Sequence, residues 1–99
     1  MISRQWRGLA KPACSQAYLD HLRNETFPAI GKLPGFLRAS LLRRTLAEGI
    51  EYLVVTEWAS LEAIRRFAGD DVERAVVSPA VREMMLEYDQ VACHYEIIE

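Results

Sequence analysis

One segment constrains the fold more than any other, because it is apolar on both faces of a strand. The run Tyr52-Leu53-Val54-Val55 lies within a predicted strand over residues 50–58. Successive residues of a strand point to opposite faces, so Tyr52 and Val54 share one face. Leu53 and Val55 share the other. An antiparallel sheet with one face in water usually carries polar residues there. Both faces of this strand are therefore expected to be covered.

The rest of the chain alternates between strand and helix patterns. Period-two and β-branched runs predict strands, and apolar spacing with N-caps at Ser60 and Ser78 predicts helices. In chain order we expect strand 2–9, a helix from Pro12 to the Pro28 region, strands 36–44 and 50–58, a helix from Ser60 to Gly69, a further helical piece over 78–88 and strand 91–98. This order predicts an α+β, ferredoxin-like split βαββαβ unit with a four-stranded antiparallel sheet. Residues 1–99 suit a single domain.

Helices on one face leave the other apolar face of the sheet without a cover. The chain has 99 residues, of which 51% are apolar, and no helix is left over for this purpose. A second copy of the same sheet is the simplest cover. We therefore expect a homodimer formed through the open sheet faces.

Charge and composition argue against several classes of partner. The formal net charge is −2, without the basic stripe of a protein that binds nucleic acid. No apolar run reaches the roughly 18 residues of a membrane span, and the first residues lack the apolar core of a signal peptide. Cys14 and Cys93 are the only cysteines. We expect a cytoplasmic protein with no nucleic-acid or membrane partner.

The usual catalytic and metal-binding motifs are missing from the sequence. Cys14 and His21 are seven residues apart on one helix face, about 10.5 Å along the axis, which is too far for one metal ion. Cys93 and His94 are adjacent in a strand and point to opposite faces. We therefore expect no metal site.

The two histidines are the candidate catalytic residues, and each has two interpretations. His94 and Glu96 share a strand face, so they could act as a base with its orienting carboxylate, or form a plain polar contact at the sheet edge. His21 lies in the apolar stripe of the first helix beside Tyr18, with Glu25 four residues later. It is either a satisfied core histidine paired with Glu25 or the polar end of a pocket.

Aromatic residues supply the candidate substrate-binding side chains. Trp58 ends the central strand and could wall a pocket beneath the helices, or be a core residue. Phe67 lies in the apolar stripe of the second helix, and Tyr18 lies one turn from His21. We take Tyr18, Trp58 and Phe67 as candidate contacts for a small-molecule ligand.

The segment Val55–Ile64 (VTEWASLEAI), continued by FAGDD at 67–71, resembles the antibiotic biosynthesis monooxygenase family. WRG at 6–8, AVV at 75–77 and HYEI at 94–97 resemble its short bacterial members. The resemblance implies a dimeric α/β barrel, and it places Trp58 where the family keeps its pocket tryptophan. The haem-degrading branch needs an asparagine on the first strand and a histidine on the second helical segment. Here Gln5 and Trp6 stand in the first region, and residues 78–87 contain no histidine.

The resemblance implies a cofactor-independent monooxygenase that acts on a small aromatic or quinol-type substrate. Such an enzyme binds a reducing aromatic molecule and helps remove its proton, after which the carbanion reacts with O₂. Two alternatives stay open, because one fold supports unrelated activities. One is a non-catalytic dimeric module for small-molecule binding or assembly. The other is an isomerase or metabolite-processing enzyme on the same fold.

Overall fold

The computed structural model describes residues 1–99 and is built on one antiparallel sheet. Its order is β2-β3-β1, and two short strands follow one another along the free edge of β1. The strands are β1 (Ile2–Ala10), β2 (Phe36–Thr45), β3 (Ile50–Trp58), β4 (Met85–Tyr88) and β5 (Cys93–Glu96). The strand β1 therefore has neighbours on both edges. The predicted α+β, ferredoxin-like fold is confirmed.

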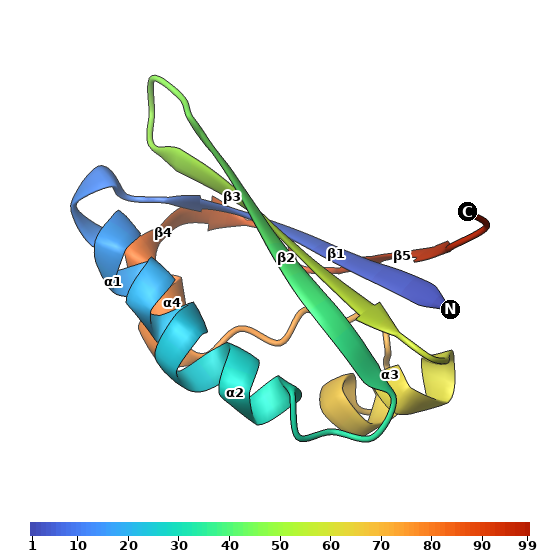
Figure 1. The fold of residues 1–99 in the computed structure, drawn as a ribbon. Coiled ribbons are helices and arrows are strands. Elements are labelled where there is room, and N and C mark those ends of the chain that lie inside the picture. The colour runs from blue at the N-terminus through green and yellow to red at the C-terminus, as the bar shows by residue number, and fades with distance from the viewer.

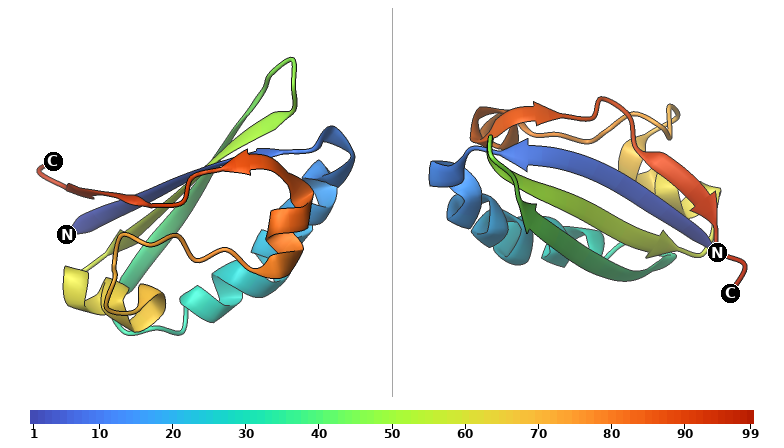
Figure 2. Two further views of the ribbon diagram at one scale, coloured as in Figure 1. Left: turned by 180° about the vertical axis from the view of Figure 1, so that it is seen from behind. Right: turned by 90° about the horizontal axis from the view of Figure 1, so that it is seen from above.

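All helices lie against one face of the sheet, which we call the inner face (Figure 1). They are α1 (Ser15–His21), α2 (Phe27–Ile30), α3 (Leu61–Ala68) and α4 (Pro79–Met84). Seen from above, no element of this chain lies over the opposite, outer face (Figure 2). None of the helices has the length and apolar composition that crossing a lipid bilayer requires.

The central strand β3 has the two apolar faces that its sequence predicts. Tyr52 and Trp58 are fully buried under the helices, and Leu53 and Val55 alternate with them toward the outer face. On the neighbouring strand, Leu42 pairs with Leu53 and keeps 51% of its surface exposed. The outer face is therefore apolar and uncovered within one subunit.

The first helical segment contains an irregular turn that the sequence does not indicate. Leu22–Thr26 form a π-helical turn between α1 and α2, and the segment ends at Ile30, two residues past Pro28. In that turn the Phe27 N–H donates to the Leu22 carbonyl, five residues back rather than four. The wider turn accommodates Pro28. Proline has no backbone N–H, and in a regular α-helix its ring would clash with the carbonyl of the preceding turn. Tyr18, Leu19 and Leu22 are buried on the inner side of this segment, whereas Ala17 is exposed.

The second helical region and the last strand also differ from the prediction. The helix that begins at the Ser78 cap ends at Met84, and Met85 and Tyr88 belong to β4 instead of the helix. The predicted strand 91–98 is reduced to β5. Met85 pairs with Ala10, so pairing with β1 overrides the helical spacing of residues 78–88. Glu96 of β5 pairs with Ile2 at the other end of β1.

Two separate core clusters fill the space between sheet and helices. One, near α1 and α4, is built from Ala10, Tyr18, Leu22, Tyr52, Val81 and Met85. The other, near α3, is built from Ile30, Trp58, Ala63 and Ile64. Gly35 allows the second cluster to close, since it has φ 87° and a Cβ there would lie 2.5 Å from the Ala63 Cβ. The two clusters do not merge, and a cavity lies where they would meet.

Candidate active site

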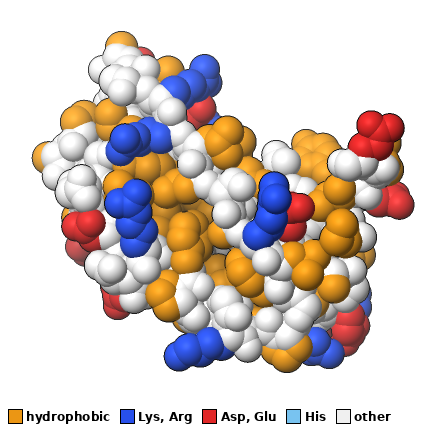
Figure 3. All heavy atoms as spheres, in the orientation of Figure 1, with side chains coloured by type: hydrophobic (Ala, Val, Ile, Leu, Met, Phe, Trp, Pro, Cys, Tyr) orange, Lys and Arg blue, Asp and Glu red, His pale blue; other side chains and the backbone are white.

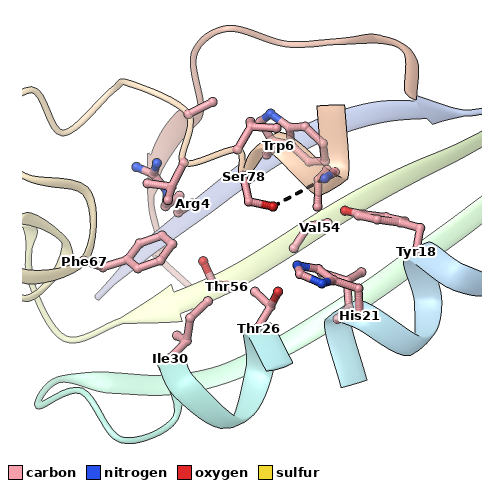
Figure 4. Close-up of a pocket in the computed structure, with 15 residues that line it drawn as sticks. Arg4, Trp6, Tyr18, His21, Thr26, Ile30, Val54, Thr56, Phe67 and Ser78 are labelled. Atoms are coloured by element: carbon pink, nitrogen blue, oxygen red, sulfur yellow. Dashed lines mark hydrogen bonds between the residues drawn. The ribbon is translucent and has the colours of Figure 1, made fainter. Parts of the chain in front are cut away.

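The cavity has a volume of about 190 Å³ and lies between the inner face and the helical layer. An apolar cavity of about 150 Å³ can hold one benzene ring. The sheet provides its floor, the 18–30 helical segment provides one wall, and the 75–81 segment provides the other (Figure 4). Ten of its fifteen lining residues are hydrophobic. On the outside of the molecule, hydrophobic side chains gather between Lys and Arg side chains on the face seen in Figure 3. The cavity therefore suits an apolar ligand of about the size of one aromatic ring.

His21 supplies one polar end of the cavity. Its Nδ1 lies 2.8 Å from Glu25 Oε2, and an ionised carboxylate can only accept a hydrogen bond. Nδ1 therefore carries the proton when the ring is neutral, and Nε2 keeps a free lone pair. His21 is half-buried, is paired with Glu25 and also lines the cavity. The π-helical turn begins directly after His21 and brings Thr26 to the same wall.

Tyr18 lies beside His21 in the cavity wall (Figure 4). Its ring packs edge-on against Tyr52 at 4.9 Å between centroids. Burial, assisted by Tyr52, raises the pKa of the Tyr18 phenol well above its ordinary value. The hydroxyl therefore stays protonated and can donate a hydrogen bond to a ligand.

Arg4 supplies the other polar end. It is only 5% exposed, and its guanidinium carbon lies 5.7 Å from the centre of the Phe67 ring. Nη1 donates to the Val72 carbonyl and also to His94 Nε2, the latter at 2.8 Å. Nη2 donates to the Arg74 carbonyl at 2.9 Å. Burial lowers the pKa of this guanidinium below its ordinary value. Arg4 is thus a buried cation held by neutral groups.

His94 lies behind Arg4 and is not among the lining residues. A guanidinium has no acceptor, so His94 Nε2 must accept the hydrogen bond and is unprotonated. Burial, and then the Arg4 charge, lower the pKa of His94, against a smaller opposing effect of Glu73. The only lone pair of the neutral ring is therefore already used, and Glu96 forms no hydrogen bond with it.

Trp58 also lies one layer behind the cavity. It is fully buried, and its Nε1 donates to Thr56 Oγ1 at 2.8 Å. Its ring stacks on Phe67 with 5.8 Å between centroids, and Phe36 packs edge-on against its other side. Trp58 thus fixes Phe67 and Thr56, which do line the cavity. Of the five predicted site residues, Tyr18, His21 and Phe67 meet in the cavity, while Trp58 and His94 support it from behind.

Several lining residues were missed from the sequence, Arg4, Trp6 and Thr56 among them. The signal for Arg4 was its place two residues before Trp6, on the same strand face. Thr56 likewise stands between Val54 and Trp58 on the inner face of β3. A polar residue in phase with an apolar strand face was the available clue. The structure contains no group of three or more His, Cys, Asp or Glu side chains close enough to share a metal ion.

The sheet and the one-sided helical layer define a small ferredoxin-like α+β protein with a partly open cavity between them. A family model of the antibiotic biosynthesis monooxygenases matches residues 1–78. The chain therefore belongs to the antibiotic biosynthesis monooxygenase family. A search of curated protein sequences finds no significant match.

Solved structures share the fold at low sequence identity. A candidate antibiotic biosynthesis monooxygenase from Caulobacter crescentus has a TM-score of 0.75 at 22% identity, covering 99% of this chain and 90% of its own. SnoaB of Streptomyces nogalater, a cofactor-independent oxygenase, has a TM-score of 0.68 at 18% identity, with 99% and 93% covered. MhuD of Mycobacterium tuberculosis, a haem degrader solved with two haems in its active site, has 0.65 at 21%, with 100% and 97% covered. At these identities the likeness concerns the fold.

Proposed function

We propose that this protein is a cofactor-independent monooxygenase that acts on a small aromatic or quinol-type substrate inside the cavity. One observation carries the proposal: a ring-sized apolar space ends at a histidine whose Nε2 is unbonded and whose Nδ1 is fixed by a carboxylate. Family membership supports a monooxygenase-like role. Haem degradation is less well supported, because residues 78–87 contain no histidine and Gln5 and Trp6 stand where that branch of the family needs an asparagine.

His21 is the proposed general base. It would take a proton from an activated C–H of the bound aromatic onto Nε2, and Glu25 would stabilise the imidazolium that forms. The substrate carbanion then reduces O₂. For an activated CH₂ group, the product is a ketone: one oxygen atom enters the product, and the other leaves as water with both substrate hydrogens. The substrate supplies all four electrons.

We assign the base to His21 rather than to His94 for a geometric reason. His94 is not a lining residue, and its Nε2 already accepts a hydrogen bond from Arg4. Tyr18 and Phe67 would contact the ring of the substrate, and Trp58 would hold Phe67 against it. The phenol of Tyr18, which stays protonated, can donate to a carbonyl oxygen that forms on the substrate.

The proposed active form is a homodimer joined through the outer faces. Leu42, Leu53 and Val55 make this face apolar, and a monomer would leave it in water. The charged residues around them are already paired within the subunit: Glu51 pairs with Arg7 and Arg44, and Glu57 pairs with Arg38. A second copy could therefore cover the face without burying an unpaired charge.

O₂ uptake by the purified protein with anthrone and with substituted hydroquinones tests the function. We expect turnover with at least one of them and a loss of about 10²–10⁴-fold in kcat for His21→Ala. Glu25→Gln should show a smaller loss. Asp20→Asn is its matched control, because Asp20 is an exposed acid on the same helical segment that contacts only Gln16. Full activity in His21→Ala would contradict the assignment of the base. Binding without any O₂ uptake would favour the non-catalytic module.

A further inference from the structure

Arg4 lacks the partner that a buried arginine normally has. Arginine is almost never fully buried unless it is paired with an anion. Here the six ion pairs of the structure involve other residues, and no carboxylate lies within ion-pair distance of Arg4. Its three acceptors are two main-chain carbonyls and a neutral imidazole. The positive charge at this end of the cavity thus has no ion-pair partner in the protein.

The donors of Arg4 are also incompletely used. A guanidinium has five N–H donors, and three of them are taken by Val72, His94 and Arg74. The Nε–H and one Nη2–H have no acceptor in the protein. Free guanidinium N–H groups are donors that suit the oxygens of a carboxylate. The contacts to Val72, His94 and Arg74 hold the guanidinium in place and leave these two donors free.

The other charged residues that line this region are also basic. A second cavity of about 430 Å³ adjoins the first across the 75–77 segment, and Arg74 and Arg82 line it. No Asp or Glu lines either cavity, although acidic residues outnumber Lys and Arg in the chain by 14 to 12. Charged lining residues in this region are thus basic without exception. The charge of the lining residues therefore suits a negatively charged ligand.

We propose that the cavity binds an aromatic carboxylate, with Arg4 as the residue that pairs with its carboxyl group. The ring occupies the apolar middle of the cavity, the carboxylate lies at the Arg4 end over the edge of Phe67, and the opposite side of the ring faces His21 (Figure 4). His94 is a positioning residue that holds Arg4 in place through Nε2. This deepens the proposed function and rests on its use of the same cavity, because it names the class of the substrate.

Calorimetric binding of 2,5-dihydroxybenzoate and of its neutral isostere 2,5-dihydroxybenzamide at pH 7.5 tests this directly. The two probes share the quinol ring and differ in the charge of one substituent. For the unmodified protein we expect the acid to bind at least about tenfold more tightly than the amide, as a charge-assisted contact gives. Arg4→Met should reduce the ratio to about one. Arg66→Met, at an exposed arginine of α3 outside the cavity, should leave it unchanged.

The variant His94→Ala tests whether His94 positions Arg4 or only stabilises the fold. It should weaken binding of the acid several-fold and leave binding of the amide unchanged, whereas a merely structural role would weaken both. If Arg4→Met does not fold, the acid-to-amide ratio of the unmodified protein still decides. Equal binding of acid and amide would overturn the inference while leaving the proposed function standing. Failure of both probes to bind would overturn both. Acid preference without O₂ uptake would support the carboxylate site and contradict only the oxygenase proposal.

Discussion

Strand β3 presents one set of side chains to the helices and a different set to the outer face, and the two sets are packed in different ways. On the inner face Tyr52 and Trp58 are fully buried and Thr56 is 5% exposed, yet a cavity lies over the strand between them. On the outer face Leu53 and Val55 are only half-buried and nothing in the subunit covers them. The inner face is completed by its own chain. The outer face is not.

The two faces also differ in whether their charged groups are paired. Outer-face charges form ion pairs within the subunit, such as Glu57 with Arg38 and Glu51 with Arg44. The inner-face cation, Arg4, has no acidic partner. A face with balanced charge suits contact with a copy of itself, whereas a face with unbalanced charge suits a charged ligand. Under the proposals made above, the outer face would serve assembly and the inner face ligand binding.

The largest expected effect comes from a charge on the outer face. Leu42→Asp should convert the dimer to a folded monomer at micromolar concentration, because burial of an unpaired carboxylate at an interface is costly. Leu42 is half-exposed in the subunit, so the monomer itself should tolerate the change. Sedimentation measures the outcome. Leu61→Asp is the control, since Leu61 is a similarly exposed leucine of the helical layer. A monomeric unmodified protein would refute the dimer.

A truncation on the inner face should act on stability rather than on assembly. Trp58→Ala removes a fully buried ring that contacts Phe36 and Phe67, and should lower the free energy of unfolding by about 3–5 kcal/mol. Urea denaturation of the two proteins gives the difference. Val55→Ala is the comparison on the outer face of the same strand and should cost much less within a subunit. Equal losses for the two variants, measured at a concentration where both proteins are monomeric, would remove the distinction between the faces.

A smaller inner-face effect is expected from one hydroxyl. Thr56→Val leaves the buried Trp58 Nε1–H without its acceptor, which should lower the free energy of unfolding by about 1–3 kcal/mol. Thr56→Ser keeps the hydroxyl and should recover most of that loss. Thermal unfolding of both variants checks the prediction. If the serine variant is as unstable as the valine variant, the methyl group matters and the hydrogen bond does not.

The smallest effect should come from the outer-face ion pairs at acid pH. Hydrogen bonds from Arg44 and then Arg7 lower the pKa of Glu51 from 4.5 to about 2. A carboxyl with a depressed folded pKa stabilises the protein fully above its unfolded pKa, and this contribution declines as the pH falls from about 4.5 toward 2. Glu51→Gln should therefore flatten the melting temperature against pH in this range. Arg44 keeps 68% and Arg7 33% of its side-chain surface exposed in the subunit, so the effect should be small. Identical acid profiles for the two proteins would count against it.

The sequence predicted the elements whose local signals agree with the tertiary structure. The apolar faces of β3 and the caps at Ser60 and Ser78 were recognised, because alternation and capping are local properties. The π-helical turn at Leu22–Thr26 was not predicted, since such a turn has no comparable local signal. Met85 was placed in a helix because its spacing fits one, and only its pairing with Ala10 makes it a strand residue.

The candidate site was predicted in part for the same reason. His21 stood out as a polar residue in an apolar helical stripe, and Phe67 followed from helical spacing. Arg4 was not recognised, because its importance depends on the carbonyls of Val72 and Arg74, almost 70 residues away in the sequence. Whether Trp58 touches the cavity or lies behind Phe67 depends on side-chain packing, which periodicity does not describe.

The double pairing of β1 has a consequence for how the chain reaches this structure. Residues 2–10 bond on one edge to β3 and on the other to β4 and β5, so that Ile2 pairs with Glu96. The second edge of the strand is therefore unpaired until β4 and β5, from residue 85 onward, have been synthesised. Such long-range pairing slows folding and leaves an open strand edge in the meantime. We expect the nascent chain to depend on chaperones more than a helical bundle of the same length would.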